Sequence, residues 1–175
     1  MSHTINALAL AYDGVQDRIL AVVNPGGLDT WSCWLTRRIV LEMLAKVPGT
    51  LGDSSSKARQ APVEYRAEVE AFEKEAALAQ TARAVSTTEG TVMRRHAPVA
   101  ELVVLVTLKP HGERFRVGLE GDRGNKAVGI MSRPDLQRVL HMLDAEVRKA
   151  AWCAEPPAAA PSDQPAPSRR RRLAN

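Results

Sequence analysis

Residues 101–131, ELVVLVTLKPHGERFRVGLEGDRGNKAVGIM, decide the fold of this chain. Apolar side chains alternate with other residues along this stretch, and two turn segments interrupt the alternation at 110–112 and 121–125. A period of two is typical of a strand with one buried and one wet face, and short glycine-bearing turns join antiparallel neighbours. The stretch predicts a three-stranded antiparallel meander that ends with a strand at 127–131. The pattern places Leu102, Val104, Val106 and Leu108 on one face of the first strand, and it predicts that Phe115, Val117 and Leu119 of the second strand face inward.

The N-terminal part of the chain predicts further strands. Residues 5–23 have the pattern of a β-hairpin, with a glycine-containing turn at 13–14 and a continuous aliphatic run at 19–23. The segment 24–27, Asn-Pro-Gly-Gly, ends this run, because proline lacks a backbone donor and glycine permits a sharp reversal. Residues 30–35 predict a third strand.

Helical patterns follow each group of strands. One helix is expected to start near Thr36, whose hydroxyl can cap it, and to stop at Pro48. A second begins at Pro62. The last follows Ser132, where Asp135 completes a capping box. We expect residues 52–61 and 84–98 to be loops.

The second predicted helix has two contrasting faces. One is an apolar stripe, and the opposite one is acidic and expected to be exposed to solvent. The stripe consists of Tyr65, Val69, Phe72, Ala76 and Ala79, and the acidic face of Glu64, Glu68, Glu70, Glu73 and Glu75.

These elements predict an α+β protein. Its antiparallel sheet combines the N-terminal hairpin with the C-terminal three-strand meander, and it carries an inserted helix pair and a C-terminal helix. Residues 1–154 are expected to form a single domain. The Ala/Pro-rich residues 155–175, which end in a run of arginines, are expected to be a disordered tail, because they cannot bury enough apolar surface to offset their ordering entropy.

Composition argues against several classes of protein. The chain has 175 residues and a net charge of +4, half of it in the tail, so its charge is weak support for nucleic-acid binding. It contains 2 cysteines, too few for a disulfide scaffold, and its histidines lack metal-ligand spacing. No signal peptide or membrane span is predicted, and a cytoplasmic location is expected. We predict no catalytic residue, cofactor or metal.

Trp34, Arg37 and Arg38 form the predicted partner-binding site. Strand alternation places Trp34 opposite the neighbouring apolar residues of the third strand. The two arginines follow at a helix start, where cations oppose the helix dipole, so helix stability does not explain them. A tryptophan beside guanidinium groups is a composition that interface hot spots favour. Burial of Trp34 beneath the helical insertion is the alternative.

Two groups of basic residues suggest a second binding mode. They could contact the phosphates of nucleic acid or another anion, but the aromatic residues that stack on single-stranded bases are missing beside them. Any such binding is expected to be weak and unspecific, and a solvated sheet face and a solubilising tail are the alternatives. The first group is Lys109, Arg114, Arg116, Arg123 and Lys126, and the second is Arg169, Arg170, Arg171 and Arg172.

Two short motifs carry a resemblance. Residues 17–20 read DRIL and residues 34–38 read WLTRR. The chain resembles, over roughly residues 8–47, small uncharacterised bacterial proteins in which a DRIL strand precedes a WLTRR strand-to-helix junction. That resemblance implies a bacterial origin and brings no known activity. The order of elements is also similar to that of the globular heads of end-joining scaffold and centriole cartwheel proteins, a likeness of fold alone.

These observations support two functional hypotheses, and a third, an enzyme with an unrecognised site, would be revived by a deep polar pocket that contains His141 or Cys33. The first is a non-catalytic interaction or accessory protein that docks onto a larger bacterial assembly. The second is a nucleic-acid-associated protein that uses the basic sheet face and the Arg-rich tail. Salt-dependent binding to DNA would distinguish the second from the first.

Overall fold

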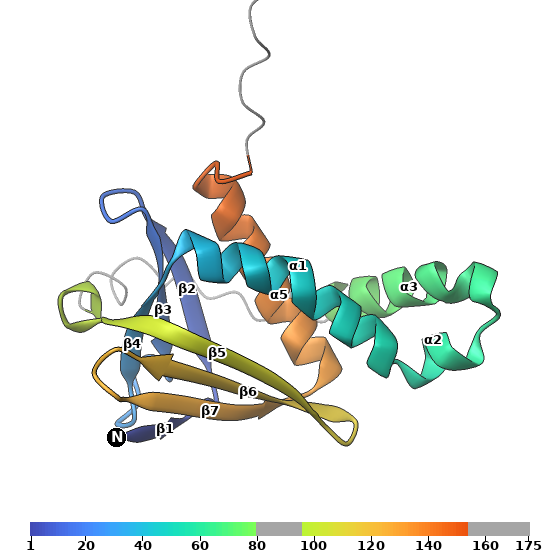
Figure 1. Ribbon diagram of the computed structural model, residues 1–175, viewed down its shortest axis with the longest axis horizontal. Helices are drawn as coiled ribbons and strands as arrows, with labels where there is room; N and C mark the ends of the chain where they lie inside the picture. The colour runs from blue at the N-terminus through green and yellow to red at the C-terminus, as the bar shows by residue number, and fades with distance from the viewer. Residues whose placement is uncertain (80–95, 154–175) are drawn as a thin grey trace, which may run out of the picture.

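The computed structural model describes residues 1–79 and 96–153 and shows an α+β fold with one curled, seven-stranded sheet (Figure 1). Three strands form the N-terminal meander and three the C-terminal one, as predicted. The strand order across the sheet is β1 (Ser2–Thr4), β7 (Lys126–Met131), β6 (Arg114–Gly121), β5 (Glu101–His111), β4 (Trp31–Leu35), β3 (Arg18–Val23) and β2 (Leu8–Asp13).

The sheet is mixed, so the prediction of a purely antiparallel sheet is wrong. The two meanders are joined by a parallel pairing in which Cys33 lies opposite Glu101 and Trp34 opposite Leu102. A parallel neighbour requires a crossover connection, and the helices between β4 and β5 supply it. At the other edge β1 pairs with β7, again in parallel. The sequence did not indicate β1 as a separate strand, since three residues are too few to show alternation.

A β-bulge changes which residues of β5 face the core. The pairing of β5 with β6 shifts between Val103 and Leu105. Val103 is buried, whereas Val104 is 54% and Leu105 50% exposed, and only beyond the bulge does Val106 contact the core. The prediction that Val104 shares one face with Val106 and Leu108 is therefore wrong, because one extra residue reverses the alternation.

The helices are α1 (Arg37–Ser54), α2 (Ser56–Gln60), α3 (Arg66–Ala79) and α5 (Arg133–Lys149), with short 3-10 turns η1 (Val63–Tyr65) and η3 (Ala97–Val99). The predicted caps are confirmed. The Thr36 hydroxyl accepts a hydrogen bond from the Ile39 amide at 3.4 Å, and Ser132 and Asp135 form the capping box of α5. The expected loop at 52–61 is instead helical at 52–54 and 56–60.

Pro48 lies inside α1 and does not end it, contrary to the prediction. Proline removes one backbone hydrogen bond from a helix and disfavours its continuation. Here the residues on either side compensate, because Val47 and Leu51 are buried in one cluster with Phe115 and Leu136. Burial of this part of α1 against the C-terminal meander and α5 outweighs the local preference to stop.

Apolar clusters cover both faces of the sheet. On one face α1 and α5 cover the main core, in which Ile19, Cys33, Val40, Leu143 and Val147 are almost fully buried. The opposite face carries a smaller cluster around Leu20, Val22, Trp34 and Ala100. Alternation along β3 and β4 supplies both clusters.

Residues 56–79, comprising α2, η1 and α3, are named here the helical arm. The arm projects sideways beyond the sheet, and α3 returns from its tip toward α5 (Figure 1). Within the described residues, none of the helices has the length and apolar character needed to cross a membrane. The predicted tail at 155–175 and most of the predicted loop at 84–98 lie outside the described residues.

Candidate binding surfaces

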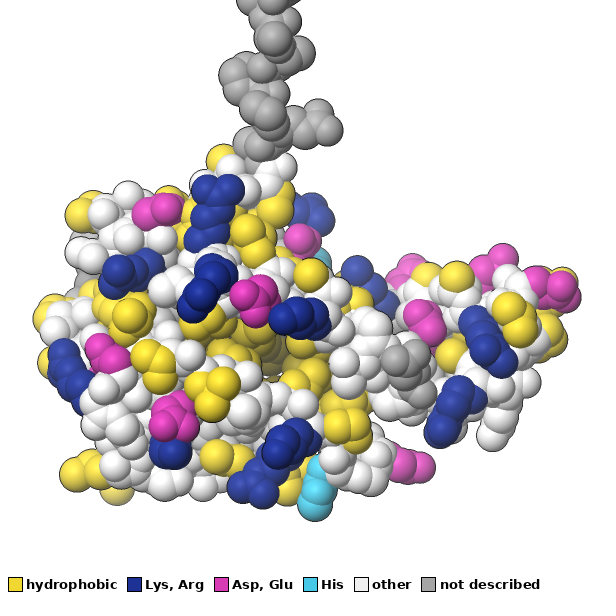
Figure 2. All heavy atoms as spheres, viewed as in Figure 1, with side chains coloured by type: hydrophobic (Ala, Val, Ile, Leu, Met, Phe, Trp, Pro, Cys, Tyr) yellow, Lys and Arg dark blue, Asp and Glu magenta, His cyan; other side chains and the backbone are white. Residues whose placement is uncertain are grey.

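The helical arm presents large apolar side chains to solvent. Val63 is 77% exposed, Tyr65 51% and Phe72 69%. Tyr65 and Phe72 are seven residues apart and so share one side of the arm. Figure 2 shows hydrophobic side chains interspersed with acidic ones along the arm. Grouped apolar side chains at a surface, unlike single scattered ones, mark interaction sites.

The acidic face of this helix is exposed as expected except at Glu73, but most of the apolar stripe is exposed as well. The stripe residues Phe72, Ala76 and Ala79 are exposed and Val69 is half-buried, whereas Glu73 of the acidic face is turned inward, with its side chain 14% exposed. The prediction that the acidic face as a whole is exposed is therefore wrong at Glu73. The name apolar stripe is kept for Tyr65, Val69, Phe72, Ala76 and Ala79.

Arg133 explains why Glu73 faces inward. Its Nη1 donates to the Leu51 carbonyl at 2.6 Å, and its Nη2 donates to the Ser54 hydroxyl at 2.8 Å. The same Nη1 lies 3.9 Å from Oε2 of Glu73, and that oxygen accepts a hydrogen bond from the Ser55 hydroxyl at 3.0 Å. Arg133 thus binds the last turn of α1, where cations are favoured, and also orients α3.

The position of Arg133 in the sequence is itself a signal that it has a partner in another element. The residue lies in the first turn of α5, where a cation opposes the helix dipole. The same argument singled out Arg37 and Arg38. A contact partner in another element explains Arg133, but only the fold shows that this partner is the end of α1 together with Glu73.

Trp34 is 8% exposed and packs in the cluster with Leu20 and Val22. The turn η3 lies beside it rather than the helical insertion, because Ala97 and Ala100 belong to the same cluster. Its ring therefore offers a partner little surface. Arg38, in the first turn of α1, is exposed. A role of Trp34, Arg37 and Arg38 in partner binding stays a prediction.

Arg37 has an internal partner. Its Nη2 donates to the Trp152 carbonyl at 2.7 Å. The Trp152 indole donates to the Asp17 carboxylate at 2.7 Å, and the Tyr12 hydroxyl donates to the same oxygen at 3.0 Å. These two hydrogen bonds, and next the charge of Arg37, lower the pKa of Asp17 below its usual 3.8. The DRIL and WLTRR motifs thus meet at the end of α5, through Asp17 and Arg37.

The basic residues of the C-terminal meander are only partly brought together. In the β5–β6 pairing Lys109 lies directly opposite Arg116, and His111 opposite Arg114. These cations and His111 form the basic hairpin named here. All four residues are exposed, and none of them forms an ion pair with another described residue. Like charges directly opposite each other destabilise a sheet, so the fold does not explain the arrangement.

The other predicted basic residues are placed differently. Lys126 is paired with Glu120 at 2.9 Å and is not free for an anion. Arg123 lies in the turn between β6 and β7. In Figure 2 blue side chains and one histidine gather at the hairpin end of β5 and β6. Arg169, Arg170, Arg171 and Arg172 lie outside the described residues.

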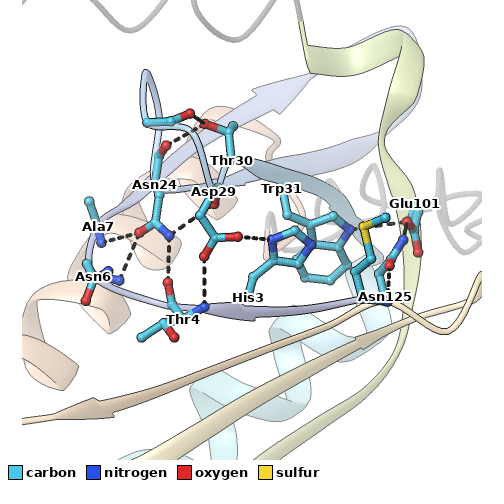
Figure 3. Close-up of polar contacts among 12 residues, drawn as sticks. His3, Thr4, Asn6, Ala7, Asn24, Asp29, Thr30, Trp31, Glu101 and Asn125 are labelled. Carbon is cyan, nitrogen blue, oxygen red and sulfur yellow. Dashed lines mark hydrogen bonds and ion pairs between the residues drawn. The ribbon is translucent and has the colours of Figure 1, made fainter.

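A polar network ties β1 and the β3–β4 turn together (Figure 3). His3 Nδ1 lies 2.6 Å from Oδ1 of Asp29, and the Thr4 amide donates to the other oxygen of this carboxylate at 3.1 Å. These two contacts, the Thr4 amide first, lower the pKa of Asp29. Asn24, at a positive φ of 50° that asparagine tolerates, accepts from the Asn6 and Ala7 amides through its side chain.

The same network contains a buried carboxylate. Glu101 is 5% exposed and accepts hydrogen bonds from the Trp31 indole, at 3.3 Å, and from the Asn125 amide. The His3 ring stacks on Trp31 with a centroid separation of 5.8 Å. Burial, and secondarily the charge of Glu101, raise the pKa of the neighbouring Cys33 thiol to about 12, so this cysteine is unsuited to act as a nucleophile. The side chains of this network hold β1, the β3–β4 turn and the start of β5 together.

Comparisons with protein-family models, with curated proteins and with solved structures found no match to this chain. Among the described residues, no group of three or more histidine, cysteine or carboxylate side chains is arranged to hold a metal ion.

Proposed function

We propose that this chain is a non-catalytic interaction protein that docks onto a larger assembly through the apolar stripe of its helical arm. The observations that support the proposal are the exposure of Tyr65 in η1 and of Phe72 in α3, next to the ion pair of Glu73 with Arg133 that holds α3 against the rest of the protein. A solvated surface helix would normally turn such a stripe toward the core. Here the Glu73–Arg133 ion pair occupies the side of α3 that faces the protein, and the stripe is left exposed to a partner.

The charges beside the stripe select the kind of partner. Between residues 64 and 75 the arm exposes four glutamates, Glu64, Glu68, Glu70 and Glu75, beside Arg66 and Lys74, whereas Glu73 is turned inward. The complementary occupant is an amphipathic helix of another protein, with an apolar face flanked by lysine or arginine. Such a helix would bury Tyr65 and Phe72 and place its cations beside the glutamates. A second copy of this arm would instead bring two acidic surfaces together.

Site-specific cross-linking tests this proposal. A photo-reactive residue at position 72 of the full chain, expressed in cells that naturally make it, should cross-link to a peptide with apolar residues at helical spacing and basic flanks. The matched control is a photo-reactive residue at position 46 on α1, whose lysine is equally exposed but lies outside the stripe. When the photo-reactive residue is placed at position 65 instead, the additional substitution Phe72→Glu should abolish the cross-link to the partner.

Two results would contradict the proposal. A cross-link between two copies of the chain, with a matching dimer in sedimentation, would make the stripe a self-association surface. Equal cross-linking from positions 72 and 46 to unrelated peptides would show that the stripe has no specific occupant. For a real hot spot, Phe72→Ala should weaken binding by about 2 kcal/mol or more, roughly 30-fold.

A specific observation favours nucleic-acid association as a second function. The basic hairpin places cations directly opposite one another on the adjacent strands β5 and β6, and phosphates would relieve the repulsion between Lys109 and Arg116. Affinity for a DNA duplex should fall steeply with salt, and R114E/R116E should weaken binding and flatten the salt slope. K57E/R59E on α2 is the control of equal charge change. Equal loss in both variants would show that net charge, rather than the basic hairpin, binds DNA.

A further inference from the structure

Strand β5 has a free edge over most of its length. β4 pairs with it only at Glu101 and Leu102, because the chain leaves the sheet after Leu35 to begin α1. Along residues 106–110, the side of β5 that faces away from β6 has no neighbouring strand among the described residues. This stretch, named here the β5 edge, runs beside α1 (Figure 1). Figure 2 shows a hollow between the two elements with hydrophobic side chains at its floor.

The register of the hairpin shows which backbone groups point to the β5 edge. His111 and Arg114 pair across a two-residue loop, so they exchange hydrogen bonds, and every second pair behind them does the same. Val106, Leu108 and Pro110 lie between these bonded pairs, and their backbone polar groups therefore point away from β6. Proline fits this position, because it is accommodated in a strand where its nitrogen faces outward from an edge.

The backbone groups of the β5 edge are unpaired. Val106 and Leu108 each offer an N–H and a C=O, and Pro110 offers a C=O. No hydrogen bond reaches these groups from any residue in the described ranges. Lys109 and Pro110 are exposed and residues 106–108 are half-buried, so the strand is open to solvent along this side. A row of unpaired backbone groups on an open edge is a template for another strand.

Apolar side chains border the edge on the side that faces the core. Ile39 and Met43 of α1, and Val106 and Leu108 of β5, are all partly buried hydrophobic residues that pack against the core clusters. An added strand would place every second side chain on this face of the sheet, beside these residues. The β5 edge therefore favours an extended segment with an apolar residue at every second position.

The charge beside the edge selects an acidic occupant. Lys109 belongs to the β5 edge and lies opposite Arg116, and the other two residues of the basic hairpin follow at its tip. Glu42 of α1 and Glu120 of β6 are paired with lysines at 3.3 Å and 2.9 Å, and Glu113 lies in the loop beyond the edge, so the excess of positive charge remains. A second copy of β5 would bring another lysine and proline, which edge strands use against pairing with each other.

We propose that the β5 edge binds an extended segment of another protein, in which apolar residues alternate with glutamate or aspartate, as an added antiparallel strand. Antiparallel pairing is the more stable arrangement per residue. The apolar residues pair with Val106 and Leu108 and lie against Ile39 and Met43, and the acidic residues lie beside Lys109 on the opposite face. This surface is separate from the apolar stripe of the helical arm.

The probe is the peptide acetyl-Glu-Val-Glu-Val-Glu-Val-Glu-amide, added to the full chain. In the free protein, the amides of Val106 and Leu108 should exchange with solvent faster than those of Thr107 and Lys109, which bond to β6. The peptide should slow exchange at Val106 and Leu108 at least about tenfold, measured by NMR.

Two methylated peptides test strand pairing without any change to the protein. N-methylation of the three valines removes the N–H groups that would face β5, so binding should be abolished. N-methylation of three glutamates gives a peptide of equal mass and charge, but the methyl groups face solvent, so binding should remain.

Protein variants test the edge and its charge. Leu108→Pro removes one edge N–H, as Pro110 already lacks its own, and should abolish binding; circular dichroism verifies its fold, and the methylated peptides decide the question if the fold is lost. Lys109→Glu should weaken binding at least about fivefold, because repulsion replaces attraction. Arg123→Glu makes the same change of charge in the exposed β6–β7 turn and should have little effect.

Several outcomes would overturn the proposal. They are binding of the valine-methylated peptide, unchanged exchange at Val106 and Leu108 at millimolar peptide, and equal losses in Lys109→Glu and Arg123→Glu. A dimer in sedimentation that protects these two amides without peptide would make the edge a self-association surface. A DNA duplex that shifts the signals of Lys109, where the peptide shifts none, would assign the basic hairpin to nucleic acid instead. None of these results bears on cross-linking from the apolar stripe, so this proposal and the docking function fail or succeed separately.

Discussion

The sheet with α5 and the helical arm follow different rules of burial. In the sheet and α5, apolar residues face the core, and Leu136, Leu143 and Val147 of the predicted α5 stripe are buried. In the arm an equally regular stripe faces outward, and a glutamate faces inward. This contrast indicates that an amphipathic pattern determines the orientation of a helix only where a large apolar surface of the protein lies beside it. In the arm, the apolar surface beside α3 consists of a few side chains such as Leu44, Leu51 and Leu140, and the contacts of Arg133 determine which side of α3 faces the protein.

The largest effect should come from the region that follows the pattern. Leu143 is 1% exposed in the main core, and Leu143→Ala should lower the free energy of unfolding by about 2–5 kcal/mol, because truncation leaves a cavity. Leu140 is half-buried beside the cleft between α3, α1 and α5, so Leu140→Ala should lower the free energy of unfolding by less than Leu143→Ala does. Urea denaturation measures both. Equal losses would mean that the cleft offers Leu140 as much packing as the core.

Individual residues show which parts of the fold and of the candidate surfaces can be predicted from the sequence. Thr36, Ser132 and the continuous aliphatic run of β3 predicted their elements because caps and strand patterns act over a few neighbouring residues. The parallel pairing of Cys33 with Glu101 could not be predicted in that way, since it depends on where a long insertion returns. Glu73 and the β5 edge were missed for the same reason: their importance arises from a partner, or a missing partner, in distant elements.

An intermediate effect should come from the contact that orients the arm. Arg133→Met removes the donors to Leu51 and Ser54 and leaves Glu73 without its cation. We expect a loss of about 1–3 kcal/mol, concentrated in the arm. Hydrogen exchange should speed up in α3 more than in β3. Uniform acceleration in both elements would show that the arm unfolds only with the whole domain.

A smaller, pH-dependent effect is expected where α5 ends on the β2–β3 hairpin. The folded state lowers the pKa of Asp17 below 3.8, so its stabilising contribution is complete above that value and is lost as pH falls through the folded-state pKa. Asp17→Asn should therefore be less stable than the parent at neutral pH, and the difference should shrink in acid. Urea denaturation midpoints of Asp17→Asn and of the parent, measured from neutral pH into the acid range, test this expectation. A stability difference between the two proteins that does not change with pH would contradict it.

The smallest effect on folding should come from the outward stripe. Phe72 is 69% exposed, so Phe72→Ser should change the free energy of unfolding by no more than about 0.5 kcal/mol. The same variant should nevertheless impair cross-linking of a partner from position 65. A loss of stability comparable to that of Leu143→Ala would show that Phe72 is part of the folded core, and the contrast between the two regions would fail.

The pairing of β1 with β7 has a consequence for the order in which the chain folds. His3 pairs in register with Ala127, so the first strand of the protein finds its neighbour only after most of the polypeptide has been synthesised. Closing so long a loop costs more entropy than forming the hairpins β2–β3 and β6–β7, whose partners are near in sequence. On the ribosome the three-stranded N-terminal meander can assemble early, whereas the edge at β1 is completed among the last events of folding.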